Sequence, residues 1–83
     1  MYDYRKLPNR QLLFFQEEIM ITVNGTKQDF TGKTVAEYLD FARYDKKRVA
    51  VEQNGRIVPR AKYEETALYN GDSLEIVRFV GGG

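Results

Sequence analysis

The chain contains no cysteine and no histidine, and these two absences remove whole classes of chemistry. Without them there is no disulfide framework, no thiolate or imidazole metal site, and no Cys/His or Ser/His nucleophile pair. A protein of this composition that handled sulfur would have to carry it on a group other than its own thiol.

Neither positive nor negative charge dominates, because the chain has 13 basic and 12 acidic residues and a formal net charge of +1. This near-balance supplies no general attraction to nucleic acid or to an anionic membrane. The short apolar run of residues 12–15 is interrupted at once by Glu17 and Glu18, and the N-terminus lacks the basic-then-apolar order of a signal peptide. We therefore predict a cytoplasmic protein with neither nucleic acid nor membrane as a partner.

Length limits the architecture. With 83 residues, 42% of them hydrophobic, the chain fits one small domain with one core. So small a domain leaves much of its surface in water, which disfavours an elaborate buried active site.

Two patterns typical of β-hairpins frame a helical segment. Residues 19–23 alternate in polarity and lead into Asn24-Gly25, a dipeptide that accepts the positive φ of a tight turn, before a returning strand at residues 27–30. The second hairpin is predicted from residues 48–53, Asn54-Gly55 and residues 56–58, and Pro59 ends its ladder.

The segment between the hairpins has the signature of a helix start. Thr34 and Glu37 have the spacing of a capping box, which satisfies two backbone N–H groups at the first turn. Apolar residues then follow at helical spacing, namely Val35, Tyr38, Leu39 and Ala42. We predict a helix over residues 34–44 with one apolar face.

The remaining chain predicts a turn-rich stretch and a last strand. Residues 61–68 are expected to form a short irregular or 3₁₀ turn anchored by Tyr63 and Leu68, and residues 70–72 a turn before a strand at 73–80. The order is ββαββ(turn)β. Because one helix covers only one face of a sheet, this order predicts an α+β fold, a β-grasp (ubiquitin-like) roll with a mixed sheet and one main helix.

The sequence ends in Gly81-Gly82-Gly83, directly after the last strand. A frayed terminus accounts for such an end as well as a functional arm does. A functional arm without side chains can enter a narrow slot and place the carboxylate of Gly83 beside a nucleotide in another protein. Adenylation would convert this poor acyl donor into an acyl phosphate, from which a sulfur nucleophile can displace AMP.

The last strand suggests where such a partner would dock. Leu74 and Ile76 share one side, while Val77 and Phe79 share the other with Glu75 and are expected to face solvent. A bulky Phe79 outside, just ahead of the tail, predicts a docking patch. Alternatively, Phe79 only stabilises the fold by packing on the uncovered face of the sheet. The predicted docking residues are Val77, Phe79, Val80, Arg78 and Arg60, although arginines at such positions are often only solvated.

Several segments resemble one known family. These are Met20-Ile21-Thr22-Val23-Asn24-Gly25, Val51-Glu52-Gln53-Asn54-Gly55, Ile57-Val58-Pro59-Arg60, Tyr63, Thr66, Leu68, Gly71-Asp72, Glu75-Ile76-Val77 and Phe79-Val80-Gly81-Gly82-Gly83. In their order and spacing they resemble the ThiS-type sulfur carriers of thiamine biosynthesis. The resemblance runs from Met20 to Gly83 essentially without gaps.

The resemblance implies a β-grasp fold and a defined reaction cycle. An E1-like adenylyltransferase would use Mg-ATP to form the acyl-adenylate at Gly83, and a cysteine-desulfurase relay would supply the sulfur of a C-terminal thiocarboxylate. Thiazole synthase would accept that sulfur. In this scheme Gly82 accompanies the modified residue and Gly81 extends the arm. The carrier itself is no enzyme and binds no cofactor or metal.

Residues 1–19 have no counterpart in a minimal carrier of this family. Pro8 is suited to open a helix, with an apolar stripe that packs on the open sheet face or on a second copy. Alternatively, Met20 is the natural start, because Gln16-Glu17-Glu18 can be encoded by a purine-rich ribosome-binding sequence. The predicted division is therefore residues 1–19 as an extension, 20–80 as the β-grasp domain and 81–83 as a flexible tail.

Other functions share parts of this pattern. The small subunit of molybdopterin synthase has the same fold and thiocarboxylate chemistry, and a protein-conjugating or tRNA-thiolating modifier would use the same glycyl adenylate. A β-grasp RNA-binding module would need a basic face. An independent enzyme has only Asp72 and Glu75 as a carboxylate pair, with no sign of a pocket around them.

Overall fold

The computed structural model describes residues 18–79, and residues 1–17 and 80–83 lie outside the described part of the chain. A single five-stranded sheet has the order β2-β1-β5-β3-β4. Its strands are β1 (Glu18–Val23), β2 (Thr26–Thr31), β3 (Val49–Gln53), β4 (Arg56–Val58) and β5 (Ser73–Arg78). The β1–β5 pair is parallel and the other pairs are antiparallel, so the sheet is mixed.

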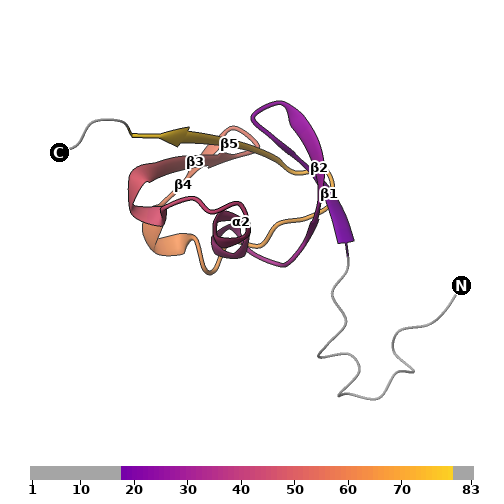
Figure 1. The fold of residues 1–83 in the computed structure, drawn as a ribbon, viewed down its shortest axis with the longest axis horizontal. Coiled ribbons are helices and arrows are strands. Elements are labelled where there is room, and N and C mark those ends of the chain that lie inside the picture. The colour runs from indigo at the N-terminus through magenta and orange to yellow at the C-terminus, as the bar shows by residue number, and fades with distance from the viewer. Residues whose placement is uncertain (1–17, 80–83) are drawn as a thin grey trace, which may run out of the picture.

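Within residues 18–79, the α-helix α2 (Val35–Phe41) lies against one face of this sheet (Figure 1). Two short 3₁₀ helices, η2 (Lys46–Arg48) and η3 (Arg60–Lys62), complete the described elements. The predicted order ββαββ(turn)β and the mixed sheet with one main helix are confirmed. The predicted turn after β4 is also present, with Tyr63 and Leu68 both buried in the core.

The core fills the space between α2 and the sheet. Its fourteen buried residues are Ile21, Val23, Phe30, Val35, Ala36, Tyr38, Leu39, Val49, Val51, Val58, Tyr63, Leu68, Leu74 and Ile76. The helix contributes the face formed by Val35, Ala36, Tyr38 and Leu39, as its apolar spacing predicts.

Both hairpin turns have the backbone that their Asn-Gly dipeptides favour. Asn24 and Gly25 have φ values of 50° and 83°, and Asn54 and Gly55 have 52° and 83°. Positive φ at both central residues is the mark of a type I′ turn, whose twist matches the twist of the flanking strands. Asn24 also uses its side chain: its Nδ2 donates to the Ile76 carbonyl at 3.1 Å and its Oδ1 accepts from the Ile76 N–H at 2.7 Å. This side chain therefore continues the pairing of β5 beyond the end of β1.

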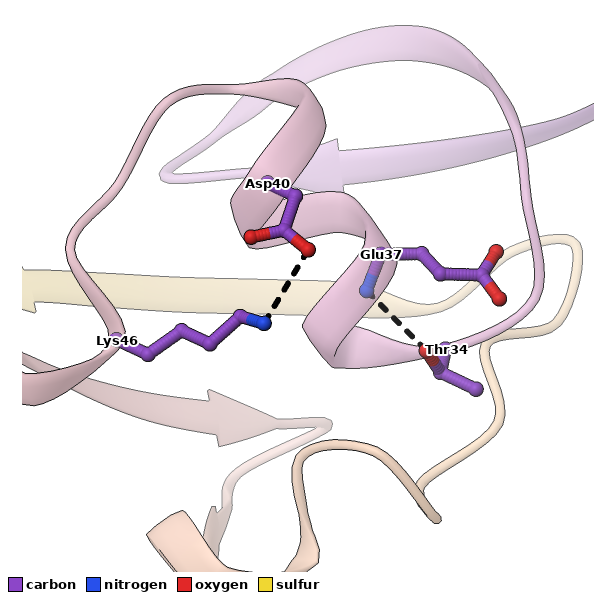
Figure 2. Close-up of polar contacts among 4 residues, drawn as sticks. All are labelled: Thr34, Glu37, Asp40 and Lys46. Atoms are coloured by element: carbon purple, nitrogen blue, oxygen red, sulfur yellow. Dashed lines mark hydrogen bonds and ion pairs between the residues drawn. The ribbon is translucent and has the colours of Figure 1, made fainter.

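The start of α2 differs in one contact from the predicted capping box. The Thr34 Oγ1 accepts from the Glu37 N–H at 3.2 Å, as predicted (Figure 2). The Glu37 carboxylate, however, accepts from the N–H of Lys33 at 2.8 Å instead of from that of Thr34. The N–H groups of Val35 and Ala36 donate to carbonyls of the turn after β4, at Thr66 and Tyr63, so that turn takes part in capping the helix.

The helix ends earlier than the prediction of residues 34–44. Arg43 has a φ of 64°, and the N–H groups of Arg43 and Tyr44 donate to the carbonyls of Asp40 and Leu39. These two bonds form a Schellman motif, which closes a helix through a left-handed residue. The chain then turns into η2, where the Lys46 ammonium lies 3.2 Å from the Asp40 carboxylate of the helix (Figure 2).

Strand β1 begins at Glu18, two residues before the start of the predicted domain. The predicted helical or non-native extension and the predicted glycine tail otherwise fall outside the described residues. Both therefore stay predictions.

Candidate functional site

The last strand leads directly to the C-terminal glycines from the middle of the sheet. Strand β5 lies between β1 and β3, and the N–H of Phe79 still donates to the Arg48 carbonyl at 2.8 Å. The end of β5 lies at the opposite end of the molecule from the start of β1 (Figure 1). Val80, Gly81, Gly82 and Gly83 follow at once but lie outside the described residues.

Side chains alternate along β5 as predicted. Leu74 and Ile76 are buried against α2, whereas Val77 and Phe79 are 59% and 57% exposed. Ala50 of β3 is the partner of Val77. Ile57 of β4, which is 77% exposed, is on the same face because it pairs with Glu52, which in turn pairs with Glu75. We call the set Ala50, Ile57, Val77 and Phe79 the apolar surface.

The two predicted arginines lie apart from this surface or at its margin. Arg78 pairs with the buried Val49, and its guanidinium carbon lies 4.7 Å from the centroid of the Tyr44 ring. It therefore faces the helix side, opposite Val77 and Phe79, and a cation–π contact holds the end of β5 to the loop after α2. Arg60 is exposed at the start of η3, two residues after the end of β4.

Asp72 belongs to the turn before β5 and is tied into a hydrogen-bond network. Its carboxylate accepts from the Tyr69 N–H, the Gln53 Nε2 and the Asn54 Nδ2, each at 2.9 Å. Burial raises the pKa of Asp72, but these hydrogen bonds to the charged form outweigh it and leave the pKa below its usual value. Asp72 thus joins the β3–β4 hairpin to the start of β5, and it is structural in character.

The end of β5 presents exposed apolar side chains, Val77 and Phe79, of the kind found in docking surfaces. Within residues 18–79, no group of three or more acidic side chains is arranged to hold a metal ion. Burial and the nearby Tyr44 raise the pKa of Tyr38, which belongs to the buried face of α2 and not to the end of β5. No helix in the described part of the chain is both long and apolar enough to span a membrane.

Comparison with known proteins shows which of the β-grasp families considered above this chain matches. The model of the ThiS family matches residues 10–83 of the sequence. This chain belongs to the ThiS family. It is thus a small sulfur carrier of thiamine biosynthesis with a ubiquitin-like fold, as its sequence resemblance predicts, and the thiamine branch is favoured over the molybdopterin synthase subunit.

Curated relatives of this ThiS-family chain differ in length. The sulfur carrier protein ThiS of Bacillus subtilis is 40% identical over 68 residues, which cover 77% of this chain and 100% of that protein. A thiazole synthase of Paramagnetospirillum magneticum is 42% identical over 64 residues, which cover 76% of this chain but only 20% of that protein. The chain therefore spans a fifth of the length of that second relative.

A solved structure has the same fold as this ThiS-family chain. The thiamine biosynthesis protein ThiS of Geobacter metallireducens is 32% identical in sequence and superposes with a TM-score of 0.67. The match covers 78% of this chain and 100% of that one. The β-grasp architecture predicted from the order of strands and helix is thereby confirmed.

Proposed function

We propose that Gly83 is the working residue of this carrier, and that its carboxylate is adenylated and converted to a thiocarboxylate for thiazole formation. The observation that carries the proposal is the position of the apolar surface. Val77 and Phe79 lie exposed at the end of β5, and the glycine tail begins two residues after Phe79. A partner that grips this surface has the C-terminus within its reach.

The chemistry needs only a carboxylate and a narrow approach. A Gly83 carboxylate oxygen attacks the α-phosphorus of ATP, pyrophosphate leaves, and an acyl-adenylate results. A sulfur nucleophile then attacks the acyl carbon and AMP leaves. If the sulfur arrives as a persulfide, a partner's thiol supplies the electron pair that cleaves the S–S bond and becomes part of a disulfide. Gly81 and Gly82 carry no side chain to obstruct either attack.

The reactive groups in this scheme belong to partner proteins. An E1-like adenylyltransferase binds the ATP and magnesium, a cysteine-desulfurase relay brings the sulfur, and thiazole synthase accepts it. The match to one fifth of a thiazole synthase supports this last partner. The carrier acts as their protein co-substrate in the cytoplasm.

The proposed docking residues are Val77, Phe79 and Val80, with Arg60 at the margin of the surface. Arg78 lies on the opposite face of β5, so we assign it a structural role instead of a docking role. Because its guanidinium stacks on Tyr44, it holds the end of β5 in place on the helix side. The last described residues before the tail are thereby held on the sheet.

Intact-mass spectrometry tests the proposed modification. The carrier is incubated with ATP, a candidate adenylyltransferase and a sulfur donor, and its mass is measured before and after. We expect a gain that matches one oxygen replaced by sulfur, and no gain for a variant that lacks Gly83. If neither adenylate nor thiocarboxylate forms with any E1-like protein of the same cell, the proposal is wrong.

A pair of matched substitutions tests the docking surface. Phe79→Asp places a charge on the apolar surface, whereas Phe41→Asp changes a phenylalanine that is 63% exposed at the end of α2. We expect Phe79→Asp to weaken binding to the adenylyltransferase about 30-fold, the size of an interface hot spot, and Phe41→Asp to leave it within about twofold. Equal affinities for both variants would remove Phe79 from the interface.

A further inference from the structure

Two glutamates lie directly opposite each other on the open face of the sheet. Glu52 of β3 and Glu75 of β5 are partners in the antiparallel register. Directly opposed residues on one face have Cβ atoms roughly 4.5–5.5 Å apart, and like charges at that distance destabilise the sheet. The sequence does not reveal this pair, because residues 52 and 75 come together only through the pairing of distant strands.

No basic residue of the described chain compensates these two charges. The ion pairs within residues 18–79 join Lys46 to Asp40, Arg48 to Asp45 and Lys62 to Glu65. The strand neighbours on one side of the glutamates are apolar, whereas the polar Asn54 and Ser73 follow on the other side. Ile57 pairs with Glu52, and the adjacent cross-strand pair is Ala50 with Val77. The acidic pair thus borders the apolar surface.

The length of the tail limits how far from this surface the adenylating partner can lie when it holds Gly83. Val80 to Gly83 span at most about 13 Å when fully extended. A protein that holds Gly83 in its active site therefore comes within that distance of Phe79 and of the face to which Phe79 belongs. The helix side offers a different environment, because Arg78 and Tyr44 occupy it at this end of β5.

We propose that the adenylating partner inserts an arginine between Glu52 and Glu75, within a contact that is otherwise apolar. This inference rests on the proposed function and specifies the chemistry of the partner's surface. A guanidinium fits because its planar fork of donors can reach two neighbouring carboxylates at once, which a lysine ammonium does less well. The partner's cation replaces the repulsion between the glutamates by two charge-assisted hydrogen bonds, while Val77 and Ile57 exclude water around them.

Charge-neutral substitutions test the proposal. The double variant Glu52→Gln/Glu75→Gln keeps the shape of both side chains and removes both charges. The control Asp29→Asn/Glu64→Gln removes the same net charge from exposed positions on β2 and in the turn after η3. The Kd of each full-length carrier for the adenylyltransferase is measured at low and high salt, together with its melting temperature.

We expect the Glu52/Glu75 double variant to bind about 10-fold more weakly, with a smaller salt dependence and an undiminished melting temperature. The control should bind within about twofold of the unchanged carrier. An unchanged Kd for the Glu52/Glu75 variant, or an equal loss in the control, would overturn the arginine contact.

The same assay keeps the two proposals apart. If Phe79→Asp weakens binding while the Glu52/Glu75 variant does not, the docking surface stands and the arginine contact fails. If Phe79→Asp also binds normally and no thiocarboxylate forms on Gly83, the proposed function itself fails.

Discussion

At the scale of single residues, Gly32 is fixed by contact with an aromatic ring. A Cβ at this position would collide with Cζ of the Phe30 ring. The Phe30 ring has little room to move, because its centroid lies 5.3 Å from that of Tyr38 and 5.6 Å from that of Phe41. We expect Gly32→Ala to lower the free energy of unfolding by about 1–3 kcal/mol, the usual cost of overpacking.

Urea unfolding checks this explanation with four proteins: the unchanged chain, Gly32→Ala, Phe30→Leu and the double variant. The cost of Gly32→Ala should shrink in a Phe30→Leu background, because the ring that would clash is gone. An equal cost in both backgrounds would point to the backbone of Gly32 instead of the ring.

Asp72 gives the stability of the protein a dependence on acid pH. Its pKa is lower in the folded than in the unfolded chain, so its contribution is fully present above the unfolded value of about 3.9 and is lost as the pH falls through the folded value. Asp72→Asn should cost on the order of 1 kcal/mol at pH 7, since the amide presents donors to groups that also donate. The free energies of unfolding of the unchanged protein and of Asp72→Asn, measured from neutral to acid pH, should become equal below about pH 4. A constant difference would contradict the role of the charge.

At the scale of elements, the end of α2 carries a strained residue. Arg43 occupies the left-handed position of the Schellman motif, where glycine is usual and other L-residues cost about 1–2 kcal/mol. Because glycine loses more backbone entropy on folding, we expect Arg43→Gly to raise the free energy of unfolding by a net of about 0.5–1 kcal/mol. Arg43→Ala removes the same charge without relieving the strain, so a similar gain in that control would refute the argument.

This strain explains why the sequence misplaces the end of the helix. The two hairpins are predicted correctly because each Asn-Gly dipeptide encodes its turn locally. No glycine marks the end of α2, and Ala42 and Tyr44 continue its apolar spacing, so the predicted helix runs to residue 44. The contact of Glu37 with Lys33 is similarly invisible, because it depends on the path of the chain before the cap.

At the scale of the whole molecule, folding and chemistry are expected to be separable. The fourteen core residues all lie between positions 21 and 76, well before the last glycines. Deleting Gly82 and Gly83 should therefore leave the melting temperature unchanged while abolishing adenylation. Calorimetry and intact-mass spectrometry on the same preparation measure both. A marked fall in the melting temperature would mean that the tail packs on the fold.

The candidate site is predictable from the sequence only in part. Alternation along β5 places Val77 and Phe79 in solvent, because a strand side chain has only two faces to choose from. The stacking of Arg78 on Tyr44 and the meeting of Glu52 with Glu75 depend on which distant strands become neighbours. Local patterns carry no record of that choice.

Two of the three Asn-Gly dipeptides, those of the hairpin turns at Asn24 and Asn54, also bear on how this protein ages. Deamidation of such a dipeptide begins when the glycine nitrogen attacks the asparagine side-chain carbon to form a succinimide. Here the Nδ2 and Oδ1 of Asn24 are both hydrogen-bonded to the backbone of Ile76. Those of Asn54 are hydrogen-bonded to Asp72 and to the backbone of Ser73. The attack at these two positions therefore requires the turn to open first, so deamidation of Asn24 and Asn54 is expected to follow local unfolding. The hydrogen bonds that tie the two hairpin turns to β5 and to the turn before it thus also protect Asn24 and Asn54 from deamidation.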